Sequence, residues 1–188
     1  VTKHYDIQHP NDDLETVTFV DGFGRAVQVK KNGVVTSASK GNSAKDENVM
    51  IVSGRNVYDA FGRVAKTFYP TTEGTGSKST FNKSFDNVSP TVTVYDVLDR
   101  ATSVILPDNS TTTTAYTVDN GSHALVTTVT DALHNVQATH TNGSGKTLKT
   151  IQKSGPDGEI TTSFEYDGIQ RLVRVTDTEG NVTTSVYD

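Results

Sequence analysis

Alternating hydrophobic and polar positions recur along the second half of the chain and predict its secondary structure. The stretches TVTVY (91–95), ATSVIL (101–106) and TTTTAYTV (111–118) are rich in β-branched residues and carry few charges. Such stretches are typical of β-strands, in which successive side chains point to opposite faces. Turn-forming residues such as PDNS (107–110) separate them. The pattern therefore predicts an antiparallel meander of short strands joined by tight turns.

The composition supports an all-β fold class. The 188 residues include 30 Thr and 24 Val but only 7 Leu and 1 Met. β-branched residues suit the pleated surface of a sheet and are poorer helix formers. The hydrophobic share of 33% is low for a globular domain, which favours a sheet that water reaches on at least one face.

A six-residue motif repeats along the chain. The copies are VDGFGR (20–25), YDAFGR (58–63), YDVLDR (95–100), TDALHN (130–135) and YDGIQR (166–171). A fainter copy is TNGSGK (141–146), and Tyr187 and Asp188 begin another. The spacing of the full copies is close to 36 residues, which indicates a basic unit of about 20 residues with paired or enlarged units.

Each position of the motif has a physical reason to lie in a turn. An Asp at the second position can accept hydrogen bonds from nearby backbone amides, and a Gly at the fifth tolerates a left-handed backbone. The predicted turn residues are Asp21, Phe23, Gly24, Arg25, Tyr58, Asp59, Phe61, Gly62, Arg63, Tyr95, Asp96, Leu98, Arg100, Asp131, Leu133, Tyr166, Asp167, Ile169 and Arg171.

A repeated turn explains the motif better than a repeated catalytic site. A sheet needs a turn at every reversal, whereas an enzyme rarely needs several copies of one site. We expect successive turns to stack along one margin of the sheet, which would bring Arg25, Arg63, Arg100 and Arg171 near Asp21, Asp59, Asp96 and Asp167. There the Arg and Asp side chains of neighbouring turns would form an alternating ladder that fixes strand register.

Two polar segments interrupt this pattern. Residues 30–54 and 70–89 are rich in Gly, Ser, Asn and Lys, and we predict long surface loops there, the second with a short strand around Phe81 and Phe85. The domain prediction is a single repeat segment over residues 1–188, excised from a longer protein.

Charge and composition weigh against several classes of site. The net charge of −5 argues against nucleic-acid binding. Without cysteine there is no disulfide or thiolate metal site, and no apolar run is long enough to insert in a membrane. His123, His134 and His140 are the one cluster that could suggest a metal, but imidazoles without a carboxylate ligand beside them make a poor metal site. We therefore predict no enzyme, no catalytic residue, no metal and no cofactor.

The motifs YDAFGR, YDVLDR and YDGIQRLVRVTDTEGNVTTSVYD resemble the YD repeats of Rhs (rearrangement hotspot) proteins. The stretch FVDGFGRAVQVKK is similar to the B component of insecticidal toxin complexes. The resemblance implies a β-sheet that spirals into a hollow shell and encloses a variable C-terminal toxin. The family's self-cleavage motif begins with Asp-Pro, a pair that this sequence lacks, so no cleavage is carried over.

This resemblance implies a curved, solenoid-like sheet that forms a non-catalytic wall segment of an Rhs/YD-repeat shell. Its expected partners are the rest of its own shell and an enclosed C-terminal toxin domain, in a bacterial protein that is secreted or at the cell surface. The alternative is an adhesion module whose two long loops bind a receptor or a glycan, because binding sites commonly lie on loops carried by a rigid scaffold.

Overall fold

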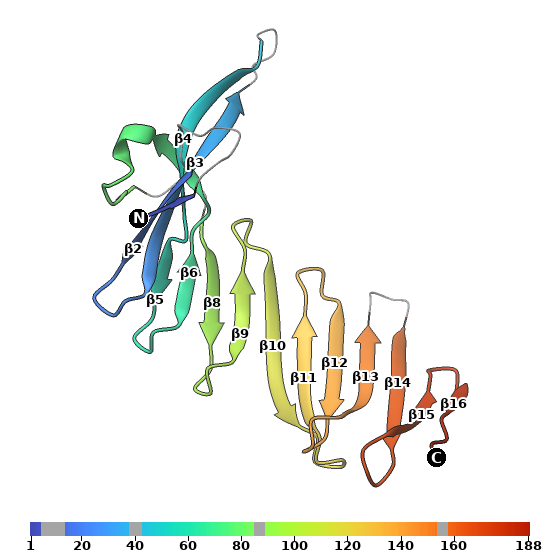
Figure 1. Cartoon of the computed structure of the whole chain (residues 1–188). Coiled ribbons are helices and arrows are strands. Elements are labelled where there is room, and N and C mark those ends of the chain that lie inside the picture. The colour runs from blue at the N-terminus through green and yellow to red at the C-terminus, as the bar shows by residue number, and fades with distance from the viewer. Residues whose placement is uncertain (5–13, 38–42, 85–88, 154–157) are drawn as a thin grey trace. The chain divides into compact units, whose positions relative to one another are not determined.

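The structure is a computed structural model, and it describes residues 1–4, 14–37, 43–84, 89–153 and 158–188. These residues form antiparallel β-strands with one short 3₁₀ helix and no α-helix (Figure 1). The prediction of an all-β antiparallel chain is confirmed. The chain divides into two compact units, residues 1–93 with 106–108, and residues 94–105 with 109–188.

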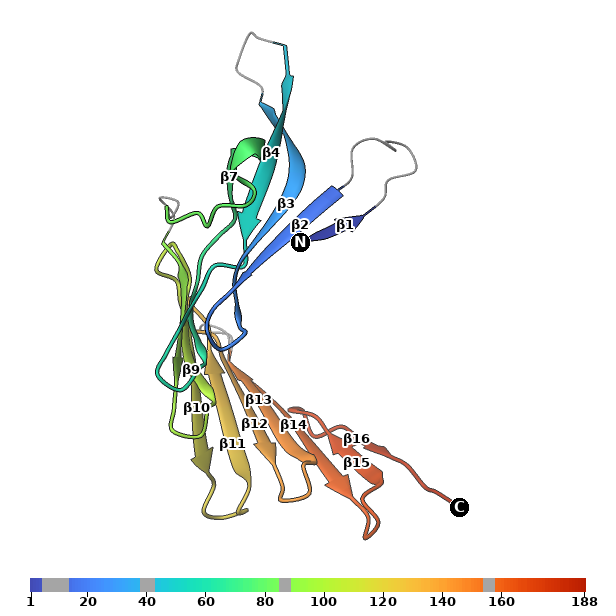
Figure 2. The same ribbon diagram turned by 60° about the vertical axis from the view of Figure 1, so that its left-hand side comes forward.

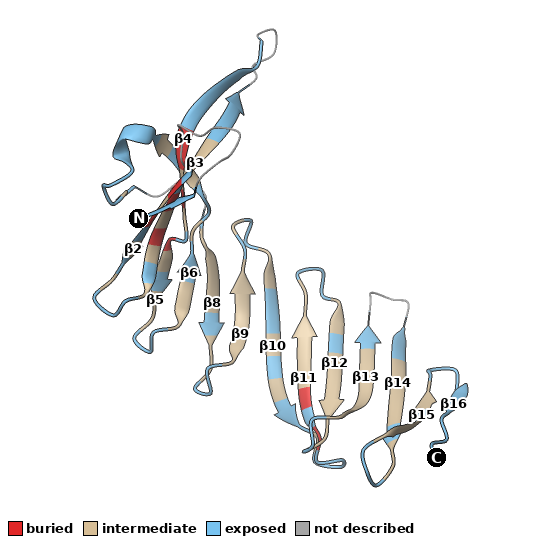
Figure 3. Cartoon of the chain, in the orientation of Figure 1, coloured by how far each residue is buried: buried red, intermediate tan, exposed pale blue. Residues whose placement is uncertain are grey.

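The first unit contains a five-stranded sheet and a small hairpin. The sheet has the strand order β1-β2-β3-β4-β7, and its strands are β1 (Thr2–His4), β2 (Leu14–Val20), β3 (Ala26–Ser37), β4 (Lys45–Ser53) and β7 (Thr71–Gly74). The helix η1 (Thr75–Ser77) follows β7, and β5 (Asn56–Tyr58) pairs with β6 (Val64–Thr67). The apolar core lies on β2 and β4, at Val17, Val49, Met50 and Val52. Figure 3 shows the buried positions of the first unit on β2, β3 and β4.

The second unit is a meander in which, from β9 onward, each strand pairs with its neighbours in sequence. Its strands are the end of β8 (Thr91–Tyr95), β9 (Ala101–Ile105), β10 (Thr111–Val118), β11 (Leu125–Thr130), β12 (Val136–Thr141), β13 (Thr147–Lys153), β14 (Glu159–Tyr166), β15 (Leu172–Thr176) and β16 (Val182–Thr184). Strands β11 to β14 lie side by side in one layer (Figures 1 and 2). Among its described residues only Ala124 and Val126 are buried. This unit is therefore a single sheet rather than a packed sandwich.

The predicted loop at residues 30–54 is wrong. The chain there forms most of the long β3–β4 hairpin, whose register runs from Val29 opposite Ser53 to Ser37 opposite Lys45. Polar residues such as Lys30 look like loop residues in the sequence, but the Lys30 side chain is 0% exposed and has partners far along the chain. A buried polar side chain with satisfied hydrogen bonds is compatible with a strand.

The prediction of a second long loop at residues 70–89 is wrong for the first part of that range. It begins with β7, which pairs with β4, and with the helix η1. The short strand expected around Phe81 is absent at that residue, and Phe85 lies outside the described residues. The part after β7 packs against the first sheet, because Phe81 meets Phe19 edge to face at 5.6 Å between ring centroids. The prediction of a single repeat segment stays a prediction.

Candidate functional site

The repeated motif forms a hairpin turn closed by its own aspartate. In the turn at Asp21, the carboxylate oxygen Oδ1 accepts the backbone N–H groups of Phe23 at 2.9 Å and Arg25 at 3.0 Å. The main chain closes the same turn, from Asp21 N to Arg25 O at 2.9 Å. This is a three-residue hairpin loop with a bulge residue in the left-handed region. The same bonds recur in the turns at Asp59, Asp96, Asp131, Asn142, Asp167 and Asp177.

The fifth position of the motif has a positive φ in each turn, whichever residue occupies it. Gly24 and Gly62 have φ of 76° and 81°, and Asp99 has 61°. His134 and Gln170 also adopt this conformation, at 64° and 68°. A left-handed backbone is strained for residues with a Cβ. The turn geometry is therefore imposed by the surrounding hydrogen bonds even where no glycine is present.

The arginine of the motif closes its own turn and does not form the expected ladder at Arg25 and Arg171. Their guanidinium groups contact Asp21 and Asp167 at 2.7 Å, four residues earlier in the chain. The ladder hypothesis placed these charges between neighbouring turns. The planar guanidinium instead reaches the carboxylate oxygen that the main chain leaves unused, so one residue pair satisfies both oxygens.

A tyrosine from later in the chain covers the basic residue of each of four turns. The Arg100 guanidinium lies 4.0 Å from the centre of the Tyr116 ring, within the range of a cation–π contact. The Tyr116 hydroxyl donates to the carbonyl of Ala101, the residue directly after the arginine. The other three contacts of this kind are Tyr58 with Arg25 and Ala26, Tyr166 with Lys146 and Thr147, and Tyr187 with Arg171 and Leu172.

These contacts explain why the tyrosine and the aspartate of the motif are adjacent. The aspartate shapes its own turn, whereas Tyr58, Tyr166 and Tyr187 each bind an earlier turn. The tyrosine–aspartate pair of the motif therefore links two hairpins, because the aspartate closes one turn and the tyrosine binds an earlier one. Tyr116 lies outside the six-residue motif, and its contact with the Asp96 turn was not predicted from the sequence.

The turns of the second unit lie at both margins of the sheet. In a meander alternate turns share a margin, so those at Asp96, Asn142 and Asp167 lie on one side and those at Asp131 and Asp177 on the other. The single margin expected for the turns with an arginine holds within this unit for Asp96 and Asp167, whereas the Asp131 copy of the motif closes a hairpin at the opposite margin. The Asp177 turn has the bonds of the motif although it was not assigned to it, and a longer turn is closed by Asp119 N, which donates to Ala124 O.

Hydrogen bonds within the turn hold the carboxyl groups in their charged form. The pKa of Asp167 is lowered from 3.8 because the backbone N–H of Arg171 and then its guanidinium donate to the carboxylate. Burial raises the pKa of Asp96, but the hydrogen bonds from Arg100 outweigh it and the net pKa is lowered. A carboxylate in this state is a turn-forming acceptor rather than a proton donor.

The apolar residue at the fourth position faces solvent. Phe23 and Phe61 are 87% and 81% exposed, and Leu98, Leu133 and Ile169 are also exposed. They do not belong to a core, because each lies at the tip of its hairpin.

A buried polar cluster fastens the segment after β7 to the first sheet, and sequence reasoning missed it. The Lys30 ammonium donates to the Glu73 carboxylate and to the carbonyls of Ser77, at 2.8 Å, and Thr80. Beside it, the Gln28 carboxamide pairs with both main-chain groups of Asn82. We call Lys30, Gln28, Glu73 and Asn82 the clamp cluster. No local signal reveals it, since its partners lie more than 40 residues apart.

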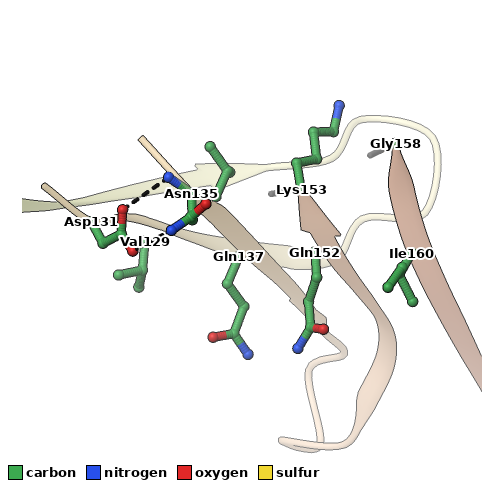
Figure 4. A pocket seen from close by; sticks show the side chains of 9 residues that line it. Val129, Asp131, Asn135, Gln137, Gln152, Lys153, Gly158 and Ile160 are labelled. Carbon is green, nitrogen blue, oxygen red and sulfur yellow. Dashed lines mark hydrogen bonds between the residues drawn. The ribbon is translucent and has the colours of Figure 1, made fainter. Parts of the chain in front are cut away.

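A cavity of about 410 Å³ lies in the second unit. Strands β11 to β14 and the Asp131 turn line it, with Gln137, Gln152 and Ile160 among its residues (Figure 4). Its ionic groups are already paired: Lys153 binds Glu159 at 2.7 Å, and Asp131 accepts a hydrogen bond from the Asn135 side chain at 2.8 Å. The cavity is thus lined by neutral and by paired groups.

The histidines do not come together as a metal site in the described part of the chain, where no group of three His, Cys, Asp or Glu residues could hold an ion. His123 and His134 occupy left-handed turn positions. His140 lies on β12 between Val126 and Lys149. Within the described ranges, no helix has the length and apolar character needed to span a membrane.

Solved structures of TcdB2-TccC3 share this fold. The structure of TcdB2-TccC3 matches with a TM-score of 0.65 and 19% identity over 94% of this chain and 10% of its own. The structure without the hypervariable C-terminal region gives 0.64 and 19%, over 93% of this chain and 9% of its own. The complex with Cdc42 gives 0.64 and 18%, over 94% and 9%. The chain thus has the fold of a segment that spans about a tenth of those chains.

Residues 1–112 match the model of a family described as a domain of unknown function, DUF6443. Since the match covers more than half of the 188 residues, the chain belongs to this family. No curated protein sequence matches it.

Proposed function

We propose that this chain is a non-catalytic wall segment of an Rhs/YD-repeat shell, and that the shell encloses a C-terminal toxin or effector polypeptide. The observation that carries the proposal is the contact between a tyrosine and an earlier turn, repeated at four places. Such a contact couples each hairpin to a neighbour, so a sheet can be extended unit by unit without a packed core. The structural likeness to TcdB2-TccC3 toxin-complex chains supports the same interpretation.

The hydrogen bonds and the lowered pKa of the turn aspartates support a structural role rather than a catalytic one. The carboxylate of Asp167 accepts three hydrogen bonds from its own turn, two from backbone N–H groups and one from the Arg171 guanidinium. A general acid or base needs a pKa near the working pH, whereas the pKa of this carboxyl is lowered. On this proposal the parent protein is secreted or at the cell surface, and its partners are the rest of the shell and the enclosed chain.

We disfavour an adhesion module. It relied on two long loops, and the first of them is the β3–β4 hairpin. The second packs in part on the first sheet through the clamp cluster.

Limited proteolysis of the full-length parent tests the proposal. The parent is compared with a form that lacks residues 1–188 and with the double variant Tyr116→Ala/Tyr166→Ala, and mass spectrometry follows cleavage in the C-terminal region. We expect protection in the parent and its loss in both altered forms. Tyr69→Ala is the control, because Tyr69 pairs with Thr91 and binds none of the motif turns that the structure describes. Protection that is the same in all forms, or absent from the parent, would show that the segment is not an enclosing wall.

A further inference from the structure

The two faces of the sheet in the second unit differ in chemistry. Directly paired residues share a face, and so do residues two apart on a strand. The register therefore places two rows on one face of β10 to β14. The first row is Tyr116, Thr127, Thr139, Thr150 and Thr162, and the second is Thr114, Val129, Gln137, Gln152 and Ile160. We call these ten residues the threonine–glutamine face.

None of the ten residues of the threonine–glutamine face is charged, and the Arg100 guanidinium that covers Tyr116 is paired with Asp96 at 2.7 Å. The charged residues of these five strands are Lys149, Lys153, Glu159 and Glu165, and the strand alternation places all four on the opposite face. Figure 4 shows this difference directly, since Gln137 and Gln152 point to one side of the sheet and Lys153 to the other. A ligand of this face is therefore recognised by hydrogen bonds and apolar contacts rather than by charge.

The face also has unused hydrogen-bonding capacity. Gln137 and Gln152 are directly paired across β12 and β13, and both are exposed. Within the described residues neither carboxamide bonds to another protein group. The cavity extends over both and over Val129 and Ile160, which lie on either side of them in the second row. Two neighbouring carboxamides between two apolar side chains can bind a ligand that alternates amide groups with apolar ones.

The clamp cluster shows what a sheet glutamine of this chain binds. The Gln28 Nε2 donates to the carbonyl of Asn82, and the Asn82 N–H donates to Gln28 Oε1, both at 2.9 Å. The carboxamide thus pairs with both main-chain groups of one residue in the segment after β7. Gln137 and Gln152 have the same groups and are open to solvent.

We propose that the threonine–glutamine face binds an extended, uncharged stretch of polypeptide through its main chain. Gln137 and Gln152 pair with its peptide groups, and Val129 and Ile160 contact its apolar side chains. The proposal rests on the proposed function, and it names this face as the one that contacts the enclosed chain. A glycan is disfavoured because Tyr116, the only ring in the two rows, is already covered by Arg100 at 4.0 Å.

Site-specific photo-crosslinking in the full-length parent tests the inference. Benzoylphenylalanine replaces either Thr139 or Thr128, two threonines at the middle of adjacent strands but on opposite faces. We expect cross-links from position 139 to the C-terminal region of the same protein and at least tenfold fewer from position 128. Cross-links mainly from position 128 would overturn the inference and leave the proposed function standing.

The remaining outcomes are also decisive. If neither position cross-links while the C-terminal region stays protected from protease, the face is wrong and enclosure holds. If neither cross-links and that region is cleaved freely, the proposed function fails and this inference with it. Dextran is added as a competitor, and loss of the cross-links in its presence would assign the face to carbohydrate instead.

A paired substitution tests the two carboxamides. Gln137→Glu/Gln152→Glu adds two adjacent negative charges to the neutral face while keeping side-chain size. We expect the cross-link yield from position 139 to fall at least tenfold. Lys149→Gln, on the opposite face, is the control and should leave the yield unchanged. An unchanged yield in the double Glu variant, with its sheet content intact by circular dichroism, would contradict binding through these residues.

Discussion

Replacement of Lys30 by methionine should release the segment after β7 from the first sheet. The Lys30 side chain is fully buried, and its ammonium donates to the Glu73 carboxylate and to the carbonyls of Ser77 and Thr80. Methionine has a similar length but no donor, so the largely buried Glu73 carboxylate loses its cation and keeps the Asn82 amide, while two carbonyls lose their donor. Removal of one member of a buried ion pair costs about 3–5 kcal/mol, because the other charge is left uncompensated. We expect a loss of that size in the stability of the first unit.

Hydrogen exchange followed by mass spectrometry measures this effect locally. Peptides that cover residues 71–84 should exchange faster in Lys30→Met, and urea unfolding of the whole chain gives the accompanying loss of stability. Lys31→Met is the matched control, since Lys31 is the next residue on β3 and is exposed. A surface substitution changes stability by no more than about 0.5 kcal/mol. If both variants exchange alike, the clamp cluster does not hold this segment and the reasoning is refuted.

Three further predictions concern the second unit. Tyr166→Phe removes the bond to the Thr147 carbonyl and should cost about 0.5–1.5 kcal/mol in thermal unfolding; an unchanged melting temperature would contradict the contact. Gly145→Ala should destabilise by about 1–2 kcal/mol because its φ is positive, whereas Gly168→Ala, equally open but without a positive φ, should stabilise by about 0.4–1 kcal/mol. Because folding lowers the pKa of Asp167 from 3.8, its carboxylate contributes fully to the stability of the folded state above pH 3.8. This contribution is lost as the pH falls through the lower pKa of the folded state, so Asp167→Asn should reduce the loss of stability in acid, measured by urea unfolding as a function of pH.

The turns could be predicted because their determinants lie within a few residues of one another. Asp167, Ile169 and Arg171 contain the hydrogen-bond acceptor, the exposed tip and the closing cation of one turn. The alternation of the strands between them is equally local. What the motif does not encode by itself is the margin of the sheet on which it lies, since the Asp131 turn lies opposite the Asp96 and Asp167 turns.

The clamp cluster could not be predicted, because the residues that interact in it are far apart in the sequence. Lys30 lies in a polar stretch that is typical of a loop, and only contact with Glu73 and the carbonyls after it makes burial favourable. The Gln28 carboxamide likewise binds a main-chain segment rather than a side chain, so no residue type marks its partner. Sequence patterns report the period of a strand, not which distant segment covers it.

From β9 onward, every strand pairs with its neighbours in sequence, and this has a consequence for the order of folding. Contacts between residues close in sequence form quickly, because little chain entropy is lost in closing them. Each hairpin from β9 onward can therefore close as soon as its second strand has left the ribosome or a translocation channel. The first unit must wait, because Lys30 finds its carbonyl partners only once Ser77 and Thr80 have been synthesised. Of the two units, the one without a core is the one that a moving chain can complete strand by strand.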